Sequence, residues 1–365
     1  SACRRSAPPG RPGCAGPAEG LAEALLARGY RVAFLVDARA ASIRDRFQHV
    51  TVHVLSAASP SRAGIVAKLS AVWKLLCGSY QAWQLIQSEK PKAVVSFGGY
   101  ASTPATVAAI FSRTPLILHE QNAVLGRAHR MVLTQTARLA LSFPRTTHAD
   151  MESCSRVIHT GNPVRAGIRT VRELPYPAPR KDGPVTLLIT GGSQGASIFS
   201  NLVPDAMALL PEEQRNRLEI IQQVREEDLQ TVRERYRKAG INAVLAPFFA
   251  DMPQRLAIAH LFLGRAGAST CCELTAVGRP SLLVPLPSAA DDHQTANANY
   301  LVDAGAAWLI PQNALTPEHL ARRITEIMNN PELLTKTAEN ARKLGKPDAA
   351  EALADVVAEF AWPTS

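Results

Sequence analysis

Apolar residues along this chain occur in short runs, separated by stretches with helix-like spacing. In the first half, the runs are residues 32–37 (VAFLVD), 93–97 (AVVSF), 115–119 (PLILH) and 137–143 (ARLALSF). In the second half they are VTLLIT, LEIIQQ, AVLAPF, LFLG, SLLVP and AAWLI, with a charged helix expected at residues 226–239. Runs of this length that alternate with helices predict a parallel β-sheet covered on both faces. The pattern therefore predicts an α/β fold.

Residues 161–184 interrupt this alternation in the middle of the chain. They are rich in Pro, Arg and Gly, from TGNPVR at the head to LPYPAPRKDGP at the tail, which is typical of a linker. A chain of 365 residues is long enough for two domains. We therefore expect an N-terminal domain at residues 17–160 and a C-terminal domain at residues 185–345. Ligands of such sheets bind at the carboxyl ends of the strands, which predicts a cleft between the domains.

Residues 1–16 do not follow the pattern. They read SACRRSAPPGRPGCAG, whereas an α/β domain should open with an apolar strand. Helix-like sequence begins only at Pro17, in PAEGLAEALLARGY. The first strand and its loop are therefore missing or replaced. Two explanations are open: a disordered tail, and an altered reading frame or truncated gene upstream of Pro17.

Composition narrows the class of protein. A hydrophobic content of 46% with only 5% aromatic residues suits an α/β protein. The net charge of +9 favours an anionic partner, but the basic residues are spread out and are not interleaved with aromatics, which argues against nucleic acid. The six cysteines lack metal-binding spacing and are too few for a disulfide scaffold, which favours a reducing cytosol. No apolar run is long enough to span a membrane.

Two glycine-rich loops follow strands in the second half of the chain. The first, Gly191–Gly195, lies in VTLLITGGSQGAS, and the second lies in GRAGASTCCE, residues 264–273. A loop between a strand and a helix start can hold a phosphate, because the helix N-terminus offers free N–H groups and partial positive charge. Together they predict nucleotide binding. An NAD-dependent dehydrogenase is disfavoured, since no GxGxxG precedes an acidic residue at the required spacing.

Six motifs occur in one order between Pro17 and the C-terminus. They are FGGYAS (97–102), HEQNAVLGRAHR (119–130), TGNPVR (160–165), TGGSQGAS (190–197), GRAGASTCCE and DDHQTANA (291–298). This set resembles the MurG-type transferases of glycosyltransferase family 28. The resemblance implies the GT-B fold: two Rossmann-like domains, the donor in the C-terminal one, and a final helix at residues 346–365 that returns to the N-terminal one.

The resemblance also implies a reaction. It is the inverting transfer of N-acetylglucosamine from UDP-N-acetylglucosamine (UDP-GlcNAc) to undecaprenyl-pyrophosphoryl-MurNAc-pentapeptide (lipid I), which forms lipid II for peptidoglycan. No cofactor or metal is implied, because a helix N-terminus can stabilise the leaving diphosphate. A UDP-sugar epimerase of the same fold is an alternative that HEQN and GNPVR disfavour.

The resemblance implies donor-site residues position by position. Ser193 and Arg165 match diphosphate contacts, and Glu273 matches the carboxylate that binds the ribose. Gln294 and Asn297 match contacts to the sugar hydroxyls, and their i, i+3 spacing would place them on one helix face. Phe249 stands at the uracil-facing position, where Ile is more usual. The other expected donor-site residues are Gln194, Arg265, Ala268 and His293.

On the acceptor side, the resemblance implies catalytic roles for Tyr100, His119 and Glu120 and a substrate contact for Asn122. The sequence departs from the family before Pro17: the expected Gly-Gly-Thr-Gly-Gly-His loop is absent, and the first histidine of the chain is His49. That loop histidine is the favoured general base, and such a base contributes about 10²–10⁴-fold. A homologue that binds UDP-GlcNAc but is catalytically impaired is therefore the alternative function.

A lipid acceptor implies contact with a membrane. Apolar residues recur at helical spacing near the end of the first fifth of the chain, namely Ile65, Leu69, Val72, Trp73 and Leu76. Arg62, Lys68 and Lys74 flank them, and a basic amphipathic helix can rest on anionic lipid. A helix packed into the domain core fits the same spacing equally well. The resemblance implies a peripheral protein on the cytoplasmic face of the bacterial inner membrane, and membership of a cell-wall synthesis complex stays open.

Overall fold

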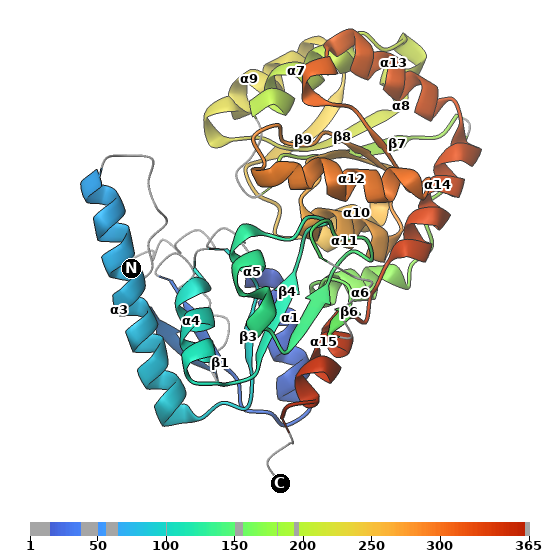
Figure 1. The fold of residues 1–365 in the computed structure, drawn as a ribbon. Coiled ribbons are helices and arrows are strands. Elements are labelled where there is room, and N and C mark those ends of the chain that lie inside the picture. Colours follow the sequence, from blue (N-terminus) through green and yellow to red (C-terminus); the bar gives the residue numbers. More distant parts are fainter. Residues whose placement is uncertain are drawn as a thin grey trace, which may run out of the picture.

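The computed structural model describes residues 15–37, 50–55, 65–99, 101–149, 156–180, 182–192 and 197–361. These residues form two lobes, which lie one above the other in Figure 1. Every pairing between named strands in both lobes is parallel. The α/β fold predicted from the apolar runs is thus confirmed.

The N-terminal lobe begins with helix α1 (Ala15–Ala27) and the strand pair β1 (Ala33–Val36) and β2 (Thr51–Val54). A four-stranded sheet follows in the order β3-β4-β5-β6. Its strands are β3 (Val94–Ser96), β4 (Leu116–Glu120), β5 (Arg138–Leu141) and β6 (Val157–His159). Its helices are α3 (Ile65–Glu89), α4 (Thr103–Phe111) and α5 (Arg127–Val132).

The C-terminal lobe contains a six-stranded sheet in the order β12-β11-β10-β7-β8-β9. The strands are β7 (Val185–Thr190), β8 (Leu218–Gln223), β9 (Asn242–Ala246), β10 (Leu261–Gly264), β11 (Ser281–Leu283) and β12 (Ala307–Leu309). The helices are α7 (Ser197–Ala208), α8 (Glu212–Arg217), α9 (Leu229–Lys238), α10 (Met252–Ile258), α11 (Ala268–Val277), α12 (His293–Asp303), α13 (Pro317–Met328) and α14 (Pro331–Leu344).

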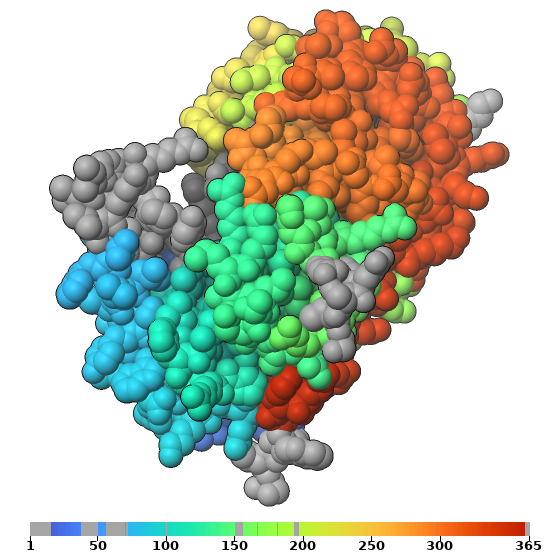
Figure 2. All heavy atoms as spheres, in the orientation of Figure 1, coloured from blue at the N-terminus to red at the C-terminus, as the bar shows by residue number. Residues whose placement is uncertain are grey.

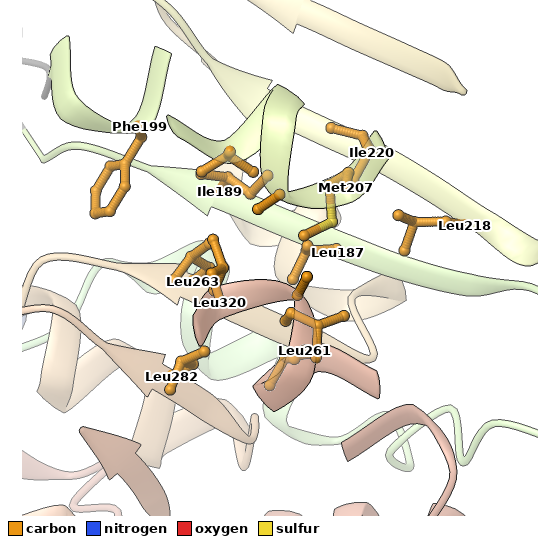
Figure 3. Packing of buried hydrophobic residues seen from close by; sticks show 14 of the residues in the cluster. Leu187, Ile189, Phe199, Met207, Leu218, Ile220, Leu261, Leu263, Leu282 and Leu320 are labelled. Atoms are coloured by element: carbon orange, nitrogen blue, oxygen red, sulfur yellow. The ribbon is translucent and has the colours of Figure 1, made fainter. Parts of the chain in front are cut away.

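Side chains on alternate positions of the central strands fill two separate cores. Leu187 and Ile189 pack on one face of the sheet with residues of α7 and α13, as Figure 3 shows. Leu188, between them in sequence, packs on the other face with Phe262 and residues of α10 and α11. Successive side chains of a strand point to opposite faces, so a strand buried on both sides is mostly apolar. In VTLLIT four of the six buried residues are apolar, and the hydroxyl of buried Thr186 donates to Glu219.

Residues 161–184, expected as a linker, contain a short helix. This helix, α6 (Ala166–Arg172), buries Ile168 completely in the same core as α10 and α11. The segment is therefore part of the C-terminal lobe's packing and not only a connection. The sequence pattern does not predict this helix, because its few apolar residues stand among Pro, Gly and Arg.

The chain crosses back to the N-terminal lobe at its end. Helix α14 runs down the side of the C-terminal lobe in Figure 1, and α15 (Ala349–Ala358) lies next to α1 in the N-terminal lobe. Leu353 and Val357 join the apolar cluster that holds Leu21 and Leu25 of α1. Arg28 pairs with Asp355 at 2.6 Å, and the Tyr30 hydroxyl donates to the Ala361 carbonyl at 2.8 Å.

Residues 1–14 lie outside the described residues. Of the atypical segment expected at residues 1–16, only Ala15 and Gly16 can therefore be compared with the structure. There, α1 begins at Ala15, two residues before the helix start expected at Pro17. Across the described parts of the chain, no helix is both long enough and apolar enough to cross a bilayer.

Candidate active site

A cleft of about 2330 Å³ is lined by residues of both lobes. The loops that follow β3, β4, β7 and β10 all reach it, because the carboxyl ends of parallel strands share one edge of each sheet. Figure 2 shows the lobes touching beside it, where green atoms of the N-terminal lobe meet orange atoms of the C-terminal lobe. At this contact Asp291 accepts hydrogen bonds from Arg127 and Arg130, each at 2.6 Å.

Two helix N-termini reach the cleft side by side from the C-terminal lobe. Strands β7 and β10 are neighbours in the sheet, and α7 and α11 follow them. Gly191 and Gly192 line the cleft before α7, while Gly267 and Ala268 line it at the start of α11. Free N–H groups and partial positive charge at helix N-termini favour an anionic group such as a diphosphate. Ser193 and Gln194 lie outside the described residues.

Glu273 and Arg165 form an ion pair on the cleft wall. Arg165 Nε donates to Glu273 Oε1 at 2.9 Å, and Nη2 donates to Oε2 at 3.0 Å. Glu273 lies in α11, whereas Arg165 immediately precedes α6. The structure therefore brings together the carboxylate expected to bind ribose and the guanidinium expected to bind phosphate. In this structure, Arg165 donates to both carboxylate oxygens of Glu273, so the groups expected to bind the ligand are bound to each other.

Arg265 and Phe249 also line the cleft, but both are largely buried. Arg265 donates to the carbonyls of Val284 and Pro285 and to Gln312 Oε1. Burial lowers the pKa of its guanidinium. The Phe249 ring lies under the Arg255 guanidinium, 5.3 Å from ring centre to carbon. Arg265 therefore anchors the loop after β11, and little of Phe249 is accessible to solvent.

The two amide side chains of α12 have different surroundings. Gln294 lines the cleft, where its Oε1 accepts from the Leu286 N–H at 3.0 Å, and His293 lines it as well. Asn297 is fully buried at the contact between the lobes and does not line the cleft. Its Oδ1 accepts from the Ala123 N–H at 2.8 Å, and its Nδ2 donates to Asn122 Oδ1 and the Ala266 carbonyl. Both amides were expected to face the sugar. In the structure only Gln294 lines the cleft, whereas Asn297 forms hydrogen bonds at the contact between the lobes.

His119 and Glu120 end β4 and point to opposite sides of the sheet, as successive strand residues must. His119 does not line the cleft. Its Nε2–H donates to the Gly161 carbonyl at 3.0 Å, and its ring centre lies 5.2 Å from that of Phe97. Burial lowers the pKa of His119 to about 4. Its position is that of a neutral core residue, which departs from the catalytic role expected for it.

Glu120 lines the cleft but its carboxylate is fully engaged. Oε1 accepts from the backbone N–H and the side-chain amide of Asn122, and Oε2 accepts from the Gly126 N–H and from His129 Nδ1. Burial would raise the pKa of Glu120, but these hydrogen bonds and the adjacent His129 hold it below its usual value. His129, which sequence reasoning missed, also lines the cleft. His129 differs from an ordinary polar residue by its contact with Glu120, and the sequence gives no signal for that contact.

Of the remaining expected residues, Asn122 lines the cleft and Tyr100 lies outside the described residues. The described side chains of the apolar set on α3, namely Val72, Trp73 and Leu76, are all exposed. Ile65 and Leu69 lie in the same helix, and their side chains are outside the description. Within the described ranges, no group of three or more His, Cys, Asp or Glu side chains comes together as a metal site.

Comparison with known proteins covers nearly the whole chain. The family model for the glycosyltransferase family 28 N-terminal domain matches residues 13–140, and the C-terminal domain model matches residues 186–353. A UDP-N-acetylglucosamine–N-acetylmuramyl-(pentapeptide) pyrophosphoryl-undecaprenol N-acetylglucosamine transferase of Rhodospirillum centenum is 47% identical over 93% of this chain and 90% of its own length. The transferase of that name from Paramagnetospirillum magneticum is also 47% identical, over 93% and 92%.

Among solved structures, MurG of Acinetobacter baumannii has a TM-score of 0.77 and 30% identity, covering 95% of this chain and 96% of its own. A UDP-GlcNAc 2-epimerase from Neisseria meningitidis has a TM-score of 0.67 over 96% and 97%, at 14% identity, a likeness of fold alone. The two lobes and the cleft thus define a GT-B glycosyltransferase. More narrowly, the chain belongs to glycosyltransferase family 28, as its motifs predicted.

Proposed function

We propose that this protein transfers N-acetylglucosamine from UDP-GlcNAc to lipid I and so forms lipid II in peptidoglycan synthesis. The observation that carries this function is the 47% identity over 93% of the chain to a transferase of that activity, which includes both lobes and the cleft between them. The 2-epimerase shares only the fold, at 14% identity.

The donor is assigned to the C-terminal lobe (residues 185–345) and the acceptor to the N-terminal lobe (residues 17–160). The adjacent N-termini of α7 and α11 suit the diphosphate of UDP-GlcNAc, because negative charge is favoured there. Glu273 would accept the ribose hydroxyls once Arg165 leaves it for a phosphate. Gln294 and His293 would contact the sugar from α12, and Phe249, which lines the cleft, would contact the uracil.

The reaction is a direct displacement with inversion. The acceptor hydroxyl attacks the anomeric carbon of the donor while the bond to UDP breaks. Negative charge grows on the leaving diphosphate, and the helix N-termini on the donor wall stabilise that charge as it develops. Asn122 and Glu120 stand across the cleft, where the acceptor sugar would lie.

The direct test is transfer of radiolabelled N-acetylglucosamine to a lipid I analogue, with UDP release measured in parallel. Labelled lipid II is expected from the wild-type chain. Calorimetric binding of UDP-GlcNAc without any transfer would instead select the alternative of an impaired, donor-binding homologue.

We further propose that α3 rests on an anionic membrane surface at the cytoplasmic face of the inner membrane. Val72, Trp73 and Leu76 are exposed together, and Trp73 has 68% of its surface accessible. Lys74 is exposed beside them, and an apolar patch with a basic neighbour favours anionic lipid headgroups. Exposure argues against the core-packing alternative for this part of the helix.

Sedimentation with vesicles tests this contact. The wild-type protein should pellet with phosphatidylglycerol-rich vesicles and much less with phosphatidylcholine vesicles. Trp73→Glu with Leu76→Glu should abolish pelleting without changing UDP-GlcNAc binding. Glu substitution of exposed Leu209, in the C-terminal lobe, is the matched control, and equal pelleting of all three proteins would contradict the assignment.

A further inference from the structure

We propose that His129 takes the proton from the attacking hydroxyl of the acceptor, and that Glu120 holds its ring for this purpose. This role rests on the proposed function. It differs from the expectation that His119 and Glu120 act directly. It comes from three features of the N-terminal lobe: the paired side chains, an unpartnered nitrogen, and two glycines beside it.

The pair determines which nitrogen of His129 is free. Glu120 Oε2 lies 2.9 Å from His129 Nδ1, and both side chains are about 95% buried. An ionised carboxylate can only accept hydrogen bonds, so Nδ1 must carry the hydrogen. The neutral ring then keeps a free lone pair on Nε2, which can accept a proton. A negative charge behind the ring stabilises the imidazolium that forms.

That lone pair has no other use within the described structure. Nε2 of His129 is buried and has no hydrogen-bond partner there. Buried polar atoms normally have partners, and an atom that lacks one is a candidate for contact with a ligand. Since His129 lines the cleft, the missing partner can come from a substrate.

Gly98, in the loop after β3, lies against the His129 ring and also lines the cleft. A Cβ at residue 98 would stand 3.1 Å from Nε2 and 3.0 Å from Cε1, tighter than nine in ten real Cβ contacts. Gly98 and Gly99 have φ values of +77° and +74°, a conformation that other residues rarely adopt. Two glycines in a row are the easiest backbone to shift. A small displacement of this pair by the acceptor opens Nε2 to its hydroxyl.

Two described carboxylates near this part of the cleft, one from each lobe, are already occupied. Glu120 accepts four hydrogen bonds, so it positions His129 and does not itself take the proton. Asp291, which reaches across from the other lobe, is held by two arginines. His293 also lines the cleft, but it belongs to the donor lobe, where its Nδ1–H donates to the Ala290 carbonyl.

In the step itself, the O–H bond of the acceptor breaks and its proton moves to His129 Nε2. The oxygen's electron pair forms the new bond to the anomeric carbon. The bond from that carbon to UDP breaks, and its electron pair leaves with the diphosphate oxygen. The imidazolium later returns the proton to water, so no other reactant is required.

The test compares His129→Gln with wild type in lipid I transfer, alongside calorimetric binding of UDP-GlcNAc. Gln cannot accept a proton at neutral pH, so kcat should fall about 10²–10⁴-fold, the usual contribution of a general base. The donor Kd should stay within threefold, which also reports that the variant is folded. His319→Gln, in α13 of the other lobe, is the matched control and should leave kcat unchanged.

A second measurement does not depend on turnover. In full-length protein with ¹⁵N-labelled histidine, the nitrogen shifts should include a ring that is protonated at Nδ1 and bare at Nε2 and that vanishes in His129→Gln, whereas the similar signal of His293, whose Nδ1–H donates to the Ala290 carbonyl, should remain. A bare Nδ1 at His129 would overturn the assignment, as would transfer by His129→Gln at the wild-type kcat. Donor binding without any transfer by wild type would overturn the proposed function and this role with it.

Discussion

The burial of His119 predicts a specific loss of stability in mild acid. His119 is fully buried with its Nε2–H on the Gly161 carbonyl, and burial lowers its pKa from 6.5 to about 4. Between these two pKa values the unfolded chain binds a proton that the folded chain does not. Stability therefore rises with pH across this window: it is complete above about pH 6.5 and falls as the pH drops toward 4.

The magnitude follows from the two pKa values. Across the whole window the shift corresponds to about 3 kcal/mol, and about 2 kcal/mol of this is lost between pH 7 and pH 5. Since the ring has no exposed surface, no reduction for solvent screening applies. His159 and His260 are partly buried with pKa values that burial also lowers, so they add to the same trend. A comparison of variants is needed to isolate His119.

The assay is urea unfolding of the full chain at pH 7 and pH 5, followed by tryptophan fluorescence and circular dichroism. His119→Gln keeps a donor for the Gly161 carbonyl but cannot gain a proton. Wild type should lose about 2 kcal/mol more than this variant between the two pH values. His319→Gln, whose ring is solvent-accessible, serves as the control and should behave as wild type. Equal losses in wild type and His119→Gln would refute the reasoning.

Three further predictions concern other contacts. Glu273→Gln should raise the UDP-GlcNAc Kd about 10- to 100-fold, because hydrogen bonds to a charged group contribute about 1.5–3 kcal/mol. The urea midpoint of unfolding should barely change. An unchanged Kd in calorimetry would show that Glu273 is not part of the donor site. Asn297→Ala should lower the free energy of unfolding by about 3 kcal/mol, since it leaves the buried Ala123 N–H and Ala266 carbonyl without their partner. An effect below about 1 kcal/mol in urea unfolding would mean that the lobe contact does not depend on this amide. Gly161→Ala should cost about 2 kcal/mol or more, because its φ is +83° and a Cβ would stand 2.6 Å from Lys346 Cβ. Gly240→Ala has a similar φ of +69° with no atom within 4 Å, so a similar loss in both variants would show that backbone strain, and not the contact with Lys346, is responsible.

The sheets were predictable from the sequence because their strands are buried on both faces. Runs such as LEIIQQ and VTLLIT have two or three consecutive apolar residues at their centre, and the structure has β8 and β7 at these residues. Strand β6 and helix α6 were not predictable in this way. The three residues of β6 are only partly buried, and α6 is surrounded by Pro, Gly and Arg. Their existence depends on neighbours from distant parts of the chain.

The parts of the site that lie in a sequence motif directly after a strand were predictable. The parts whose role depends on contacts between distant residues were not. The glycine loops before α7 and α11 follow strands, so their arrival at one edge is expected from the parallel topology. His129, in contrast, reads as one more polar residue in GRAHR. Its meaning comes from Glu120, which reaches it from the end of β4. Similarly, His119 and Glu120 are neighbours in the motif, but successive strand residues point to opposite faces, so only Glu120 lines the cleft.

The return of α15 to α1 has a consequence for the order in which the protein can be completed during synthesis. The C-terminal lobe is continuous, whereas the N-terminal lobe needs the last helix to cover Leu21, Leu25 and Ile117. Those side chains are made early, yet Leu353, Val356 and Val357, which cover them, are made only after the whole C-terminal lobe. Burying three such side chains contributes about 1.5–3 kcal/mol each. The first lobe to be translated is therefore the last to close, and until then its apolar surface is available to chaperones or to neighbouring nascent chains.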